Sequence, residues 1–188
     1  MKTKKLVHLA MLAALTILLG VVPNVGIIQL APMISLTILH IPVLIAALLY
    51  GIEGGIFIGL VFGVTSWFVA VTRGATPLDL LFVNPLVSVL PRVLFGAASG
   101  LLYRIVGKEG TWIKDATVAF IGSLIHSLLV LTYVFIFGLS IFYSGTNFTE
   151  GIQVYIAFIL GANVLPEALF AGFVCASVGK ALKRILNR

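Results

Sequence analysis

Arg92 is the residue whose chemistry most needs an explanation, because it lies inside an apolar stretch of membrane length. The stretch runs from Phe82 to Arg104 and reads FVNPLVSVLPRVLFGAASGLLYR. A guanidinium stays charged at any cellular pH, and placing it in hydrocarbon costs about 2.5 kcal/mol or more. Its partner is either Glu167 in the last apolar segment or the carboxylate of a small ligand, and the sequence leaves both open.

Further polar and aromatic residues lie near the predicted outer ends of the apolar segments. Asn84 and Asn163 can each donate and accept hydrogen bonds, so they suit hydroxyls and amides. Arg92 suits a carboxylate in bidentate geometry. Glu167 follows a proline, which frees a backbone carbonyl, and is expected to bind ligand hydroxyls or to hold Arg92. The predicted substrate-binding residues are Arg92, Asn84, Asn163, Glu167, Trp67, Phe68, Thr72 and His40.

His40 also has a plain structural interpretation, whereas Trp67 and Phe68 are given an apolar role in the site. His40 precedes Pro42 at the start of an apolar segment, where a histidine at a helix end is at least as common as a ligand-binding one. Trp67 and Phe68 are predicted to form an apolar wall of the site. One asymmetric pocket for one small polar molecule fits these single polar residues better than a channel, which needs rings of repeated ones.

The sequence offers little for catalysis. Ser99 and His126 resemble the dyad of intramembrane serine proteases, but Ala97 and Ala98 stand where those enzymes usually carry a Gly-x-Ser-Gly pattern. The three histidines are dispersed without carboxylate companions, so we predict no metal site and no catalytic residue. No Walker sequence is present, so the chain is not expected to hydrolyse ATP and no cofactor is expected in it.

Composition indicates an integral membrane protein. Of the 188 residues, 61% are hydrophobic and only 10% are charged, compared with about 25% charged residues in ordinary soluble proteins. The formal charge of +6 does not indicate nucleic acid binding, because the basic residues cluster at segment ends. Runs of about 20 apolar residues favour helices over a barrel.

Six apolar segments are expected to form one all-α transmembrane domain over 1–188. They cover about 6–22, 34–50, 54–72, 86–104, 115–138 and 153–181. All but two of the lysines and arginines fall on one side of a six-span model, which places both termini in the cytoplasm by the positive-inside rule. Semi-polar outer loops 1, 3 and 5, at 23–33, 73–85 and 139–152, are expected to cap an outward-facing pocket.

Taken together, the chain resembles the substrate-binding membrane subunits, or S components, of energy-coupling factor (ECF) vitamin transporters. The similarity covers the whole chain and includes an Ala-x-x-x-Ala strip, AMLAA at 10–14, in the first segment. The segments HIPVLIAALLYG (40–51), GGIFIGLVFGVTSW (54–67) and FVNPLVSVLPRVLFG (82–96) resemble the pantothenate-type branch.

The resemblance implies a multi-pass subunit of a prokaryotic cell membrane that captures pantothenate, with its carboxylate on Arg92. It implies a transmembrane coupling subunit (EcfT) as partner, with Ala10, Ala13 and Ala14 as the contact surface, and two cytoplasmic ATPases (EcfA and EcfA') that hydrolyse ATP. The alternatives are the same type of subunit for riboflavin or a pyridoxine-like vitamin, and an autonomous secondary transporter. Against the last, no inverted repeat of interrupted helices is detectable.

Overall fold

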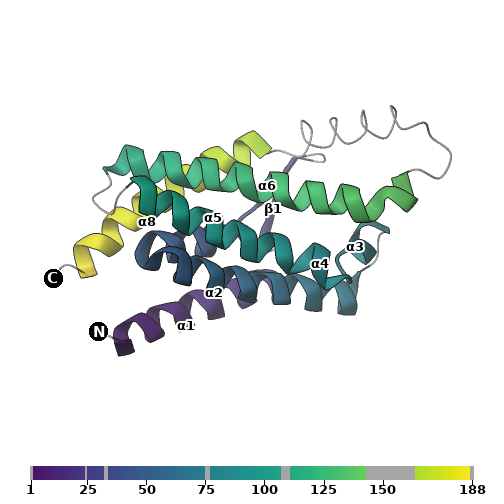
Figure 1. Cartoon of the computed structure of the whole chain (residues 1–188), viewed down its shortest axis with the longest axis horizontal. Helices are drawn as coiled ribbons and strands as arrows, with labels where there is room; N and C mark the ends of the chain where they lie inside the picture. Colours follow the sequence, from purple (N-terminus) through teal and green to yellow (C-terminus); the bar gives the residue numbers. More distant parts are fainter. Residues whose placement is uncertain are drawn as a thin grey trace.

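The chain folds into a bundle of long apolar helices, shown in Figure 1. This computed structural model describes residues 2–23, 25–31, 34–74, 77–106, 111–142 and 164–186. Five helices of the described part are long and apolar enough to cross a membrane. The predicted all-helical membrane fold is therefore confirmed, with one small β-hairpin added to it.

The first helix and the hairpin form the N-terminal part of the bundle. Helix α1 spans Lys2–Val21, and its apolar side chains are mostly exposed, as expected of a helix facing lipid. Strands β1 (Ile27–Ala31) and β2 (Ile34–Thr37) pair antiparallel, with Ile27 opposite Thr37. The predicted segment 34–50 thus begins as a strand, and its helix starts only at Ile41.

Helix α2 (Ile41–Arg73) reverses direction at Gly51. Gly51 has φ 66° and ψ −146°, a conformation that only glycine adopts readily. A Cβ atom added at Gly54 would lie 2.5 Å from the carbonyl oxygen of Ala46, although eight residues of a straight helix span about 12 Å. The two arms, 41–50 and 52–73, therefore lie antiparallel.

The remaining helices complete the bundle. Short helices α3 (Pro77–Leu81) and α4 (Pro85–Ser88) lead into α5 (Leu90–Val106). Helices α6 (Trp112–Phe142) and α8 (Val164–Leu186) follow. Both termini lie at the same end of the molecule (Figure 1), as an even number of passes requires. The cytoplasmic placement of that end rests on the charge pattern.

Close backbone contact fixes the second arm of α2 against α5. Gly55 and Gly59 are four residues apart and so share one helix face. A Cβ atom at Gly55 would overlap the carbonyl oxygen of Gly96, and one at Gly59 would overlap that of Arg92. In a membrane, small residues of this kind let helices associate through van der Waals packing. The glycine row therefore determines where Arg92 lies.

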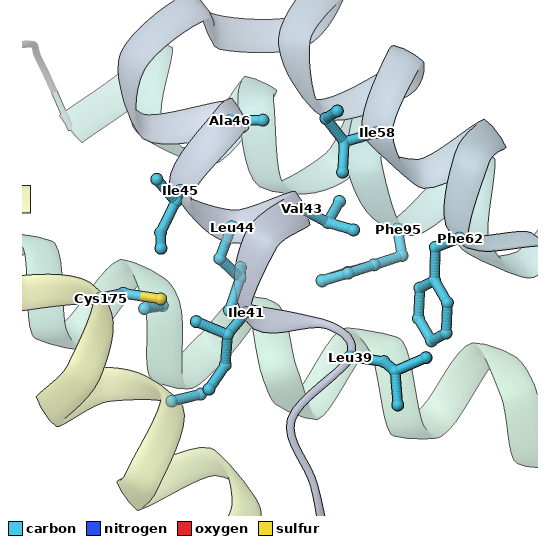
Figure 2. Close-up of a cluster of buried hydrophobic side chains, with 12 residues drawn as sticks. Leu39, Ile41, Val43, Leu44, Ile45, Ala46, Ile58, Phe62, Phe95 and Cys175 are labelled. Carbon is cyan, nitrogen blue, oxygen red and sulfur yellow. The ribbon is translucent and has the colours of Figure 1, made fainter. Parts of the chain in front are cut away.

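Buried apolar side chains fill the space between these helices. Figure 2 shows the cluster, with Val43 and Leu44 from the first arm of α2, Phe62 from the second arm and Phe95 from α5. Cys175 of α8 is fully buried in the same cluster and acts there as a small apolar residue. Phe62 and Phe95 also border the polar residues described next.

Candidate substrate-binding site

Arg92 is held by a carbonyl that the neighbouring proline leaves free. In a regular helix the amide of residue 91 would bond to the carbonyl of Val87, but Pro91 has no N–H. Arg92 Nη1 donates to that Val87 oxygen at 2.7 Å instead. The break between α4 and α5 thus orients the guanidinium, whose residue is only 6% exposed.

Two aromatic rings enclose the guanidinium. Its central carbon lies 5.5 Å from the centre of the Phe62 ring and 4.9 Å from that of Phe82. Cation–π contacts of this kind are worth about 0.5–2 kcal/mol each. The rings hold the side chain in place, but they cannot replace an anion, because neither carries a formal charge.

The geometry leaves Arg92 without a carboxylate partner in the described part of the chain. Lys5 and Glu53 form an ion pair far from Arg92 in sequence, with 2.5 Å between Nζ and Oε2. Glu167 does not form an ion pair with Arg92 in the structure; its Oε1 accepts a hydrogen bond from the backbone N–H of Thr37 at 2.7 Å. Glu167 thereby ties the start of α8 to strand β2.

The position of Arg92 in the first turn of α5 strengthens the need for an anion. The N-terminus of a helix carries about half a positive charge from its aligned peptide dipoles. Arg92 adds a full positive charge at the same end, and Nε of its guanidinium has no hydrogen-bond partner. An anion bound here would interact favourably with the Arg92 guanidinium.

A second group of buried polar residues lies beside Arg92, and sequence reasoning gave it no binding role except for His40. The rings of His40 and His126 stack with their centres 5.4 Å apart. Ser123 Oγ lies 3.2 Å from His40 Nε2, within hydrogen-bond distance. The His126 ring also contacts Phe62 and Phe95, with centres 5.6 Å and 4.8 Å away.

Helical spacing accounts for this group. Ser123 and His126 are three residues apart on α6, and Phe95 and Ser99 are four apart on α5, so each pair shares a helix face. Ser99 Oγ and both ring nitrogens of His126 are buried without a hydrogen-bond partner. No hydrogen bond joins Ser99 to His126, so the proteolytic dyad is not assembled in this structure. The sequence signal that could have identified this group was the helical spacing of polar residues, such as Ser123 and His126, within apolar segments.

The other predicted site residues do not gather around Arg92. Trp67, Phe68, Thr72 and Asn84 are all exposed in the described structure. Trp67 Nε1 donates to the Val83 carbonyl at 3.0 Å, and the Thr72 hydroxyl donates to the Phe68 carbonyl at 2.8 Å. Their ligand-binding roles stay predictions.

Asn84 has a local structural role. Its Oδ1 accepts from the backbone N–H of Leu86 at 3.0 Å and caps α4. Asn163 and most of predicted outer loop 5 lie outside the described residues. Loop 1 lies partly within them and contributes strand β1 of the hairpin.

The alanine strip of α1 divides between two faces of the helix. Ala10 and Ala14 are exposed, whereas Ala13 is half-buried and packs against the apolar core. Exposed small residues allow the close approach of another helix. The predicted contact with a coupling subunit is compatible with this arrangement for Ala10 and Ala14, and it stays a prediction.

Comparison with known proteins places this geometry in context. The family model described as "ECF transporter, substrate-specific component" matches residues 4–179. The chain is 28% identical over 165 residues to the pantothenic acid transporter PanT of Lactococcus lactis subsp. cremoris, covering 80% of this chain and 79% of that protein. It is also 28% identical over 196 residues to the pantothenate transporter PanT of Leuconostoc mesenteroides, covering 100% of this chain and 96% of that protein.

Proposed function

We propose that this chain, which belongs to the family of substrate-specific components of ECF transporters, captures pantothenate for ATP-driven uptake. It is a multi-pass protein of a prokaryotic cell membrane, and its family is one of transporters rather than enzymes. The proposal concerns the identity of the vitamin and the residues that bind it. It also concerns the coupling to a transmembrane partner (EcfT) and two ATPases (EcfA and EcfA').

The observation that carries the proposal is the buried guanidinium of Arg92. Burying a lone charge has a large desolvation free energy unless an opposite charge pairs with it. Arg92 forms one described hydrogen bond, to the Val87 carbonyl, and contacts two aromatic rings. A carboxylate delivered by the substrate would complete this environment, and the pre-oriented guanidinium would lose little conformational entropy on binding it.

Pantothenate fits this site by its chemistry. It carries one carboxylate at one end, while its amide and two hydroxyls are uncharged. Riboflavin and pyridoxine-like vitamins lack a carboxylate, so they would leave the positive charge of Arg92 unanswered. The two relatives with pantothenate in their names support the same choice independently of the geometry.

The first experiment identifies the ligand directly. The protein is purified without added vitamin, denatured, and the released small molecules are analysed by mass spectrometry. We expect pantothenate. Riboflavin or another vitamin without a carboxylate would overturn the proposed substrate.

The second experiment measures the contribution of the carboxylate by isothermal titration. Panthenol serves as the matched ligand, because it differs from pantothenate by an alcohol in place of the carboxylate. A desolvated charge pair is worth about 2–5 kcal/mol, so panthenol is expected to bind about 30-fold or more weakly. Equal affinity for the two ligands would contradict the proposed role of Arg92.

A further inference from the structure

The face between α5 and α6 carries three buried polar atoms that have no hydrogen-bond partner. They are Ser99 Oγ, His126 Nδ1 and His126 Nε2. Ser99 is 0% exposed and His126 is 7% exposed, so neither side chain is open to solvent in the described structure. Buried polar groups are rarely left unpaired, and three on one face indicate that a further group binds here.

The two residues face the same small region. A Cβ atom added at Gly122 would lie 3.1 Å from Ser99 Oγ, so Ser99 reaches α6 at Gly122. Gly122 and His126 are four residues apart and therefore lie one helical turn from each other. Phe95, one turn from Ser99 on α5, contacts the His126 ring with centres 4.8 Å apart.

His126 is positioned by its neighbouring rings. His40 stacks on one side of it, and Ser123 holds His40 through the 3.2 Å contact with Nε2. Phe62 and Phe95 contact the same ring at tilted angles of 34° and 53°. These contacts fix the orientation of the imidazole, and neither of its nitrogens has a hydrogen-bond partner.

Phe62 connects this region to Arg92. The centre of its ring lies 5.5 Å from the guanidinium carbon of Arg92 and 5.6 Å from the centre of the His126 ring. The fixed charge and the unpaired imidazole are therefore separated by about one aromatic side chain. A small molecule with a polar group at each end can reach both.

We propose that His126 and Ser99 bind an uncharged hydroxyl or amide of the substrate whose carboxylate Arg92 binds. This inference rests on the proposed function and assigns the second half of the recognition site. A hydroxyl both donates and accepts a hydrogen bond, which complements an imidazole and a serine side chain. A site of this kind rejects analogues that lack the hydroxyl, because its own buried groups are then left unpaired.

The test combines variants with matched ligands in isothermal titration. His126→Phe keeps an aromatic ring against Phe62 and Phe95 but removes both nitrogens, and Ser99→Ala removes only the hydroxyl. We expect each variant to bind pantothenate roughly 5- to 100-fold more weakly, as the loss of one or two buried hydrogen bonds predicts. Analogues with hydrogen in place of one hydroxyl should bind the native protein more weakly. For at least one of these analogues, the loss of affinity relative to pantothenate should be smaller in His126→Phe or Ser99→Ala than in the native protein.

The ratio of affinities for pantothenate and panthenol separates recognition from a structural role. Both ligands carry the hydroxyl end, so this ratio should stay unchanged in His126→Phe and Ser99→Ala, whereas variants of Arg92 should reduce it. His8→Phe removes an imidazole that bonds to Tyr50 elsewhere, and Thr117→Ala removes an exposed hydroxyl of α6. Both control variants should bind pantothenate as the native protein does.

Several outcomes would overturn the inference. Native affinity in both His126→Phe and Ser99→Ala would show that water alone satisfies these groups, while the assignment of Arg92 would stand. A reduced pantothenate-to-panthenol ratio would mean that the variants disturb Arg92. If His126→Phe fails to fold, His126→Leu, which also lacks hydrogen-bonding groups, and Ser99→Ala decide by the same criteria. If the native protein does not bind pantothenate, the proposed function fails and this inference fails with it.

Discussion

Replacing Arg92 by glutamine tests the central electrostatic argument. The substitution removes a buried positive charge that has a single described hydrogen bond, so a bound carboxylate loses its counter-charge. The pair is enclosed by Phe62 and Phe82 and is screened little by salt. We expect a loss of about 2–5 kcal/mol, which is about 30-fold to several thousand-fold in pantothenate affinity.

The assay is isothermal titration of pantothenate and panthenol against the native protein and three variants. Arg92→Gln should bind both ligands with similar weak affinity, and Arg92→Lys should retain part of the preference, since lysine keeps the charge but not the planar fork. Arg104→Gln is the matched control, because Arg104 is exposed at the other end of α5. Native pantothenate affinity in Arg92→Gln, or an equal loss for both ligands, would refute the reasoning.

Three further predictions concern the bundle that holds the site, and each is measured as the unfolding free energy of the purified protein. Gly51→Ala should destabilise it by about 1–3 kcal/mol, because alanine is strained at φ 66°; an unchanged value would mean that the reversal does not need glycine. Gly55→Ala should cost about 1–3 kcal/mol by overlap with Gly96, and no loss would show that the helices separate freely. Glu167→Ala should cost about 1–3 kcal/mol, because it leaves the Thr37 N–H without its acceptor. Glu167→Gln keeps an acceptor oxygen and should lose less stability. Equal losses in the two variants would contradict the role of Glu167 as the acceptor for Thr37.

Hydropathy predicts the passes of this fold well and its short elements poorly. Apolar length alone identifies α1, α5 and α6, because few other structures satisfy the backbone in lipid. The run from Ile34 to Thr37, ISLT, alternates apolar and polar residues as a half-buried strand does, but the average hydropathy of the longer segment hides this short pattern. Pro42 was the available signal, since proline favours the first turn of a helix and so predicts a start near residue 41.

The sequence identifies charged site residues more readily than uncharged ones. Arg92 stands out because a charge within an apolar segment is costly wherever the helix lies. His126 and Ser99 acquire a shared role only when α5 packs against α6, and that packing depends on contacts distant in sequence. Asn84 before Pro85 is also a common helix-start signal, and its hydrogen bond to Leu86 follows that pattern.

The site also explains why the glycine row of α2 packs against α5, the helix that carries Arg92 and Ser99. Unpaired groups such as Ser99 and His126 reduce the stability of the ligand-free protein, because each loses its hydrogen bonds to water. A loosely packed bundle would relax and pair them internally. Gly55 and Gly59 bring α2 into backbone contact with α5 and limit that relaxation. Because a ligand that pairs these groups binds only the folded protein, its binding should stabilise the fold, and the stabilisation should rise with the logarithm of ligand concentration above Kd.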